Sequence, residues 1–304
     1  MSDATALDRV VREAGGTDVL DRLAGLPGAD LITLLLAVMR RRADRLTPAD
    51  VLRRYRDDRF VTPAAVPFHQ SRAIEDRLIS LLPNGFEPVT LAPVVPLGTH
   101  SAVGTVHQDQ VVTTIRGTEV AADATNGLAL VAADRRRGAL RTDPVVRLAT
   151  LQRVVRAQRF DGAGRFAHFG LLGMVSAGRD TGDLAFERQH VVEHTRFLMT
   201  TLLAIGGDRA ELRLTVAEPR LVPVGDAVRA AMAELAGVTV VDDPDRPAGR
   251  GYYAGLCYKA FVVRGDVATE IADGGLVDWT GLLLGNRKER LVISGAGIEG
   301  LATL

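Results

Sequence analysis

The chain has 304 residues, of which 47% are hydrophobic, so it can bury a substantial core in one or two domains. Its 37 basic and 37 acidic residues give zero net charge, which excludes a global field that holds nucleic acid. The single cysteine, Cys257, excludes an internal disulfide and a cysteine-rich metal site. No signal peptide opens the chain, and its most apolar early run, residues 31–39, is too short to span a bilayer. We therefore expect a cytoplasmic protein with no membrane partner.

Residues 1–60 predict a separate N-terminal segment of short helices. Leucines cover most of the circumference of the helix expected over residues 31–42, which predicts that this helix is buried. Thr47, Pro48 and Asp50 supply an N-cap hydroxyl, a first-turn proline and an early acid for the last of these helices.

The next segment predicts a linker, a helix and a strand. Residues 60–67 contain two prolines and show no clear period, which indicates a linker into the main domain. Residues 72–82 have apolar side chains at helical spacing, and Pro83 and Gly85 end that helix. Residues 86–91 then predict a short strand.

Asp123 and Thr125 stand at a predicted strand-to-helix junction. A β-branched strand is expected over residues 110–115, and an Ala- and Leu-rich helix follows Thr125. A carboxylate and a hydroxyl at such a junction form a good acceptor for an ammonium group. The alternative is a helix N-cap, which is the more frequent role for these residue types at a junction.

Residues 151–178 predict a hairpin, because two strand-like runs flank the sequence Phe-Asp-Gly-Ala-Gly-Arg. Arg156, Gln158 and Arg165 lie near its turn. Guanidinium groups in this position can bind a phosphate or a carboxylate.

A long helix is expected over residues 184–205, and it contains His190, Glu193 and His194 in an H-x-x-E-H pattern. Two histidines four residues apart share a helix face and can hold zinc. However, so short a pattern arises easily and no third ligand is evident, so we expect a packing helix and no metal site.

Tyr252 and Tyr253 follow an acidic, turn-rich stretch at residues 242–247. Tyrosines here can line a pocket with flat apolar faces and hydroxyl groups. The alternative is ordinary packing in a half-buried strand, which is the more usual fate of such a pair.

Taken in chain order, these segments resemble the motifs of class II aminoacyl-tRNA synthetases, most closely histidyl-tRNA synthetase and its regulatory paralogue of ATP phosphoribosyltransferase. The matching stretches are residues 72–93 for motif 1, Asp123 and Thr125 for the acid–spacer–threonine step, residues 155–158 and 164–166 for motif 2, Tyr252, Tyr253 and Gly255 for the histidine-specific loop, and residues 295–301 for motif 3.

The resemblance covers residues 70–304 and implies an α+β fold, with a mainly antiparallel sheet flanked by helices and residues 1–60 as an N-terminal helical extension. It implies a homodimer through residues 72–93, although an ordinary helix-turn-strand would look the same. No anticodon-binding domain follows motif 3, so we do not expect tRNA as a partner.

The resemblance also implies a site. Its substrate-binding residues would be Asp123, Thr125, His168, Tyr252 and Tyr253, with the ammonium of an amino-bearing metabolite on Asp123 and Thr125. Its nucleotide-binding residues would be Arg156, Gln158 and Arg165, and Arg156 would be catalytic if adenylation occurs.

Two departures weaken the expectation of ATP and Mg²⁺ as cofactors. Gly300 stands where motif 3 has the arginine that holds the terminal phosphates, so a charge-assisted anchor is lost. Gln158 replaces the acid of motif 2 and carries no charge. Arg287, Lys288 and Arg290 are the alternative cations for the phosphates.

Three functions remain open. The first is a binding or regulatory protein for an amino acid or another amino-bearing metabolite. The second is an ATP-dependent, adenylate-forming ligase that transfers an activated carboxylate to an amine or a carrier. The third is an interaction module that contacts a protein partner through residues 1–60. Gly300 favours the first function over the second, and the pair Asp123 and Thr125 argues against the third.

Overall fold

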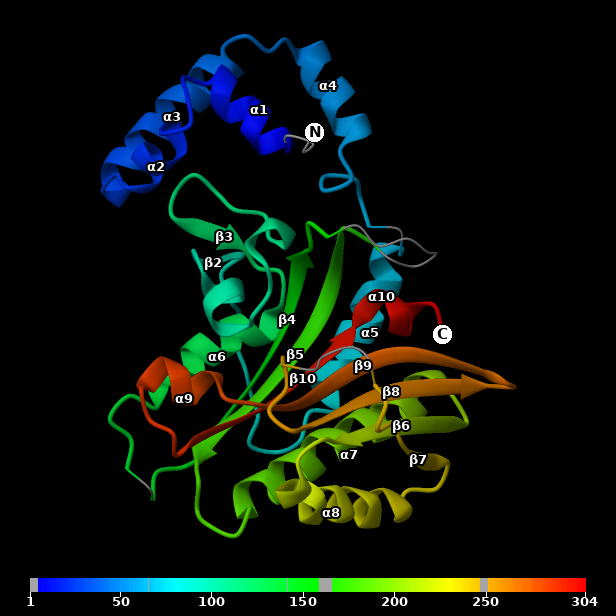
Figure 1. The fold of residues 1–304 in the computed structure, drawn as a ribbon. Coiled ribbons are helices and arrows are strands. Elements are labelled where there is room, and N and C mark those ends of the chain that lie inside the picture. The colour runs from blue at the N-terminus through cyan, green and yellow to red at the C-terminus, as the bar shows by residue number, and fades with distance from the viewer. Residues whose placement is uncertain (1–4, 65, 141, 159–165, 247–250) are drawn as a thin grey trace. The chain divides into compact units, whose positions relative to one another are not determined.

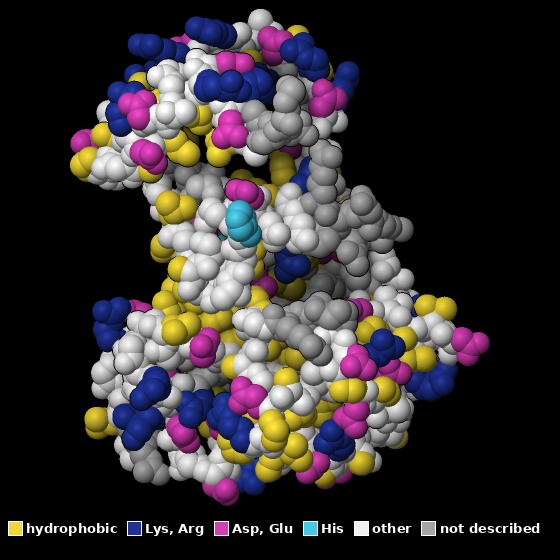
Figure 2. Space-filling model, in the orientation of Figure 1, with side chains coloured by type: hydrophobic (Ala, Val, Ile, Leu, Met, Phe, Trp, Pro, Cys, Tyr) yellow, Lys and Arg dark blue, Asp and Glu magenta, His cyan; other side chains and the backbone are white. Residues whose placement is uncertain are grey.

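The computed structural model describes residues 5–64, 66–140, 142–158, 166–246 and 251–304. The chain divides into two compact units, one of residues 1–62 with 113–118 and one of residues 63–112 with 119–304. Within the described ranges, no helix is both long enough and apolar enough to cross a membrane. Figure 2 shows that basic and acidic side chains are interspersed on the surface of each unit, in keeping with a net charge of zero.

The N-terminal unit consists mainly of four described helices: α1 (Ala6–Glu13), α2 (Val19–Ala24), α3 (Gly28–Ala43) and α4 (Pro48–Asp57) (Figure 1). The predicted cap of α4 is confirmed, because the Thr47 hydroxyl accepts from the Asp50 backbone N–H and Asp50 accepts from the Thr47 backbone N–H. The predicted burial of the helix at residues 31–42 is wrong. None of the described side chains of α1 to α4 is buried, since four short helices offer too little neighbouring surface to cover one another.

The second unit is built on a large sheet in which the described residues form eight strands (Figure 1). Their spatial order is β1 (Glu87–Pro88), β4 (Val146–Val155), β5 (His168–Arg179), β10 (Glu289–Gly297), β9 (Val267–Val277), β8 (Leu256–Arg264), β6 (Arg209–Val216) and β7 (Val238–Asp242). The six central strands pair antiparallel, and only the edge strands β1 and β7 pair parallel to their neighbours. The predicted fold class, a mainly antiparallel sheet flanked by helices, is confirmed.

Helices cover both faces of this sheet and create two layers of core (Figure 1). On one face pack α5 (Phe68–Ser80), α7 (Ala185–Gly206), α8 (Val222–Ala233) and α10 (Ile298–Ala302). On the other face pack α6 (Ala124–Arg135) and α9 (Trp279–Leu284), whose Leu128 and Trp279 contact strand residues such as Val175 and Ile293. The α6 face carries the site described below.

The segment between α5 and α6 differs from the sequence prediction. It holds the short strands β2 (Val94–Pro96) and β3 (Thr118–Val120), a π-helical turn (Thr99–Val103) and a 3-10 turn (Gln108–Gln110). The strand expected over residues 110–115 is not formed. The backbone there bonds to separate segments instead, because the carbonyl of Gln110 accepts from Ala157 and that of Val112 accepts from Val120. The β-branched composition of residues 110–115 was therefore not sufficient to form a paired β-strand.

Candidate functional site

A cavity of about 490 Å³ lies between the N-terminal end of α6 and the part of the sheet formed by β8 and β9. Five of the residues proposed from the sequence line it, namely Asp123, Arg156, Gln158, Tyr252 and Tyr253. They come from three distant stretches of the chain. The fold therefore gathers most of the expected site in one place.

Asp123 is both the N-cap of α6 and a wall of the cavity. Its Oδ1 atom accepts hydrogen bonds from the backbone N–H and the hydroxyl of Thr125, at 2.8 and 2.7 Å. Its Oδ2 atom lies 3.6 Å from Nη2 of Arg156. The capping role is thus realised, and one carboxylate oxygen still faces the cavity. Thr125 itself is buried behind Asp123.

Arg156 is held in place from two sides. Its Nε atom donates to the carbonyl of Ala122 at 3.1 Å, and its guanidinium lies over the Phe169 ring, 5.0 Å from the centroid. These contacts leave Nη2 directed toward Asp123. The result is a fixed carboxylate–guanidinium pair whose separation is longer than that of a tight ion pair.

His100 and Glu119 form a fully buried pair that holds the backbone at Ala122, next to Asp123. The backbone N–H of Ala122 donates to Nε2 of His100 at 2.9 Å, so Nδ1 must carry the proton that is shared with Glu119 at 2.7 Å. Burial acts to raise the pKa of Glu119, but hydrogen bonds from Gln108 and from the backbone of His100 and Gly98 outweigh it and hold that pKa below its ordinary value. Sequence reasoning missed this pair; an acid between Thr118 and Val120 in a strand was the signal available.

Tyr252 and Tyr253 form an aromatic wall. Their rings meet edge to face with centroids 4.9 Å apart, and Tyr252 meets Trp279 in the same way at 5.3 Å. Burial raises the pKa of both hydroxyls well above the ordinary value, so both are neutral hydrogen-bond donors. The hydroxyl of Tyr253 donates to Oδ2 of Asp273 at 2.9 Å.

Four charged residues of the cavity were missed by the sequence analysis: Arg246, Lys259, Glu270 and Asp273. Lys259 and Asp273 lie opposite each other on β8 and β9, and Lys259 donates to Glu270 at 2.7 Å. Arg246 lies 3.5 Å from Asp273 and 5.4 Å from the centre of the Tyr253 ring. The fact that Asp273 interrupts an otherwise apolar stretch of β9 was the only local signal.

His168, which was expected to bind substrate, is not among the residues that line this cavity. Side chains alternate along β5, and Phe169 packs on the α6 side with Ala121 and Ala124, so His168 faces the opposite side of the sheet. There its Nδ1 atom lies 2.8 Å from Arg153. Arg165, expected to bind nucleotide, lies outside the described residues.

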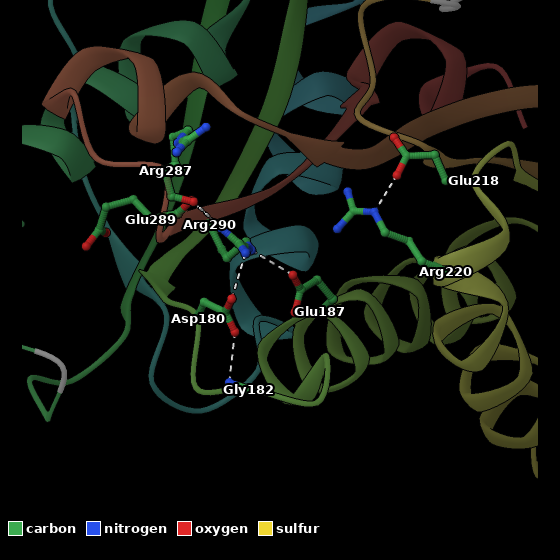
Figure 3. A network of polar contacts seen from close by, with 8 residues as sticks. All are labelled: Asp180, Gly182, Glu187, Glu218, Arg220, Arg287, Glu289 and Arg290. Carbon is green, nitrogen blue, oxygen red and sulfur yellow. Dashed lines mark hydrogen bonds and ion pairs between the residues drawn. The ribbon is translucent and has the colours of Figure 1, made fainter.

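The region that resembles motif 3 supplies no cation to the cavity. Glu299 accepts from the backbone of Gly170 at 2.8 Å and from Arg153 at 3.0 Å, while Gly300 has no side chain to offer. Arg290, an alternative cation, pairs instead with Asp180 at 2.7 Å and with Glu187 at 2.8 Å, as Figure 3 shows.

Arg290 also lies at the wrong end of its strand to replace the motif 3 arginine. It stands near the start of β10, and Gly300 follows the end of that strand. At about 3.3 Å per residue, the two positions are separated by more than 20 Å. Arg287 and Lys288 precede Arg290 and are farther away still.

The H-x-x-E-H residues each have protein partners. His190 shares a hydrogen bond with Glu193 at 3.0 Å, whereas His194 lies between the hydroxyls of Ser176 and Ser294, at 3.0 and 2.7 Å. Burial lowers the pKa of His194 to about 3. Across the part of the chain that the structure describes, no group of three or more His, Cys, Asp or Glu side chains is placed to hold a metal ion.

Comparison with known proteins supports the fold. No family model matches the chain, and no curated protein matches its sequence. Among solved structures, apo histidyl-tRNA synthetase from Staphylococcus aureus aligns with a TM-score of 0.62 and 15% identity over 80% of this chain and 68% of that one. An ATP phosphoribosyltransferase regulatory subunit/histidyl-tRNA synthetase from Bacillus halodurans aligns with a TM-score of 0.58 and 14% identity over 80% and 81%.

A third structure, pyrrolysyl-tRNA synthetase from Desulfitobacterium hafniense, aligns over 98% of this chain and 84% of that one, with a TM-score of 0.51 and 17% identity. These likenesses confirm that the chain has a fold like that of class II aminoacyl-tRNA synthetases. At such low identity they show the fold alone.

Proposed function

We propose that this synthetase-like chain binds an amino acid or another amino-bearing metabolite in the α6 cavity, in a binding or regulatory role without tRNA charging. The observation that carries the proposal is the pair Asp123 and Arg156, whose facing atoms are 3.6 Å apart at the cavity wall. A zwitterion complements such a pair, because its ammonium can bind Asp123 while its carboxylate binds Arg156.

The rest of the cavity suits a small ligand of this kind. Its volume of about 490 Å³ lies in the range of small-molecule sites. Tyr252 and Tyr253 add flat apolar faces, and the Thr125 hydroxyl donates to Asp123, which holds that carboxylate in place.

The alternative function is an adenylate-forming ligase, and Arg156 is the observation that favours it. A fixed guanidinium over the Phe169 ring, beside Gln158, resembles a partial site for a nucleotide phosphate and base. The residues present fit ATP only in part, because Gly300 offers no cation and Arg290 is bonded to Asp180 and Glu187. Nor do the described side chains form a cluster for Mg²⁺. We therefore derive no step through ATP.

We also propose two protein partners for the chain. The first is a homodimer, formed through the segment that contains α5 and β1. The second is a protein partner for residues 1–60, where apolar side chains such as Leu7, Leu34 and Val51 are exposed. A cytoplasmic location is part of the same proposal.

Calorimetric titration of the full chain with an amino-acid panel tests the main proposal. The Asp123→Asn variant keeps the side-chain shape and removes the charge. Because a hydrogen bond to a charged group is worth about 1.5–3 kcal/mol, the affinity of the bound amino acid should fall roughly ten- to a hundredfold. Asparagine caps a helix about as well as aspartate, so the melting temperature should barely change.

A matched control is Asp278→Asn, which alters the N-cap residue of α9, where the side chain makes no cap hydrogen bond. This variant should bind as the parent does. If no panel member binds the parent chain, the proposed ligand class is wrong. If the Asp123→Asn variant binds the same amino acid as tightly as the parent, Asp123 does not receive the ammonium. Pyrophosphate exchange that depends on one amino acid would establish the ligase instead.

A further inference from the structure

The cavity is lined by a second carboxylate besides that of Asp123. Asp273, on β9, lines the cavity, and its side chain is partly buried, with 44% of its surface exposed. Its Oδ2 atom accepts from the Tyr253 hydroxyl at 2.9 Å and lies 3.5 Å from Nη2 of Arg246. Its Oδ1 atom accepts no hydrogen bond from the described residues. One oxygen of this carboxylate therefore remains for a ligand.

The cations on the same wall are less accessible than this acid. The guanidinium side chain of Arg246 is only 4% exposed, and Lys259 is 20% exposed and donates to Glu270 at 2.7 Å. On this wall the carboxylates are therefore more accessible than the cations. A positively charged or hydrogen-donating group is the complement of that surface.

The electrostatics of Asp273 agree with this geometry. Burial raises the pKa of its carboxyl above the ordinary value, and the charge of Asp123 adds to that effect, while Tyr253 and Arg246 oppose it. The two carboxylates therefore repel each other across the cavity. Cationic groups placed against them would relieve this repulsion.

Asn126 gives an independent indication that the cavity holds a ligand. It lies one helical turn after Asp123 on α6, lines the cavity and is completely buried. Neither Oδ1 nor Nδ2 has a hydrogen-bond partner among the described residues. Buried amides in folded proteins are almost always hydrogen-bonded, so this one calls for a partner that the described residues do not supply.

We propose that the ligand is an amino acid whose side chain carries a second permanent positive charge, with its α-ammonium against Asp123 and its side-chain ammonium or guanidinium against Asp273. This inference rests on the proposed function and narrows its ligand class. Asp273 is then the residue that determines specificity, since a neutral side chain would leave its carboxylate uncompensated within the cavity.

The test uses pairs of ligands that differ mainly in the side-chain charge. Lysine is compared with norleucine, and arginine with citrulline, by calorimetric titration of the full chain. The parent should bind at least one cationic member ten times or more tightly than its neutral partner. In the Asp273→Asn variant this ratio should fall toward one, while the affinity for the neutral member stays within about twofold. Asp266→Asn, an exposed position on the β8–β9 turn, is the matched control and should keep the parental ratio.

The outcomes distinguish failure of this inference from failure of the proposed function. Norleucine or citrulline binding as tightly as its cationic partner overturns the inference and leaves amino-acid binding intact. A parental ratio that persists in Asp273→Asn likewise overturns the role of Asp273. Absence of binding by every member of the panel overturns both proposals. Should Asp273→Asn fail to fold, the comparison of lysine with norleucine on the parent chain still decides the ligand class.

Discussion

The buried histidine His194 should make the free energy of unfolding depend on pH between pH 7 and pH 5. Its ring is completely buried between Ser176 and Ser294, and burial lowers its pKa from the ordinary 6.5 to about 3. The unfolded chain therefore binds a proton at higher pH than the folded chain does. Stability from this group is fully present above pH 6.5 and is lost as the pH falls toward 3.

The magnitude follows from these two pKa values. Each pH unit between them changes the free energy of unfolding by about 1.4 kcal/mol. Between pH 7 and pH 5 the unfolded histidine goes from about a quarter protonated to almost fully protonated while the folded one stays neutral, so this group should remove about 2 kcal/mol of stability. Four carboxyl groups have a lowered pKa: Asp50, Glu87, Glu119 and Glu193. Their ordinary values are 3.8 or 4.5, so they contribute below this window.

Urea unfolding, followed by the fluorescence of Trp279, measures this loss. Trp279 is the single tryptophan of the chain and is buried in the core beside α6, so its emission reports on the second unit. In a His194→Gln variant, the chain should be less stable at pH 7, because the bonds to Ser176 and Ser294 change, but the loss between pH 7 and pH 5 should shrink by about 2 kcal/mol.

His107→Gln is the matched control, because the His107 side chain is 73% exposed and is hydrated in both states. The His107→Gln variant should lose as much stability between pH 7 and pH 5 as the parent does. The reasoning fails if the parent loses no stability between pH 7 and pH 5, or if His194→Gln loses as much as the parent does.

Two further predictions concern packing and assembly. A Cβ atom at Gly275 would come within 2.5 Å of the Leu256 carbonyl oxygen and 2.8 Å of the Tyr253 ring, so Gly275→Ala should cost about 1–3 kcal/mol of stability by urea titration. At Gly295 the nearest atom would be 3.6 Å away, so Gly295→Ala should cost less than about 1 kcal/mol, and equal losses would contradict the packing argument. If the segment with α5 and β1 forms a dimer, sedimentation at micromolar concentration should give twice the chain mass of 32.5 kDa. A single species of 32.5 kDa would exclude that assembly.

The parts of the fold that could be predicted from the sequence depend on neighbouring residues or on motifs that keep their order along the chain. The cap at Thr47, the long helix α7 and the hairpin of β4 and β5 follow from neighbouring residues, and the structure contains all three. The fold class came from short motifs that keep their order along the chain. Asp123 was expected either to cap a helix or to face a ligand, and the structure shows the cap with one oxygen directed into the cavity.

The missed residues depend on strand register, which no local pattern shows. Lys259 and Asp273 become neighbours only because β8 and β9 pair in one register. The side of the sheet that His168 faces could not be predicted for a related reason. Most of β5 is buried on both faces, so its sequence shows no polar alternation from which its facing could be read.

The departures from the synthetase pattern affect the nucleotide side of the site differently from the acceptor for the amino group. On the nucleotide side, Gly300 provides no cation, Gln158 provides no charge, and Arg290 is bonded to Asp180 and Glu187. On the ammonium side, Asp123 keeps a carboxylate oxygen toward the cavity. Holding a triphosphate requires several charge-assisted contacts at once, whereas an ammonium group needs one well-placed carboxylate. Losses of charge on the nucleotide side would therefore weaken activation of a carboxylate before they weakened recognition of an amino group. This asymmetry is the physical reason for preferring a protein that recognises an amino acid to one that activates it.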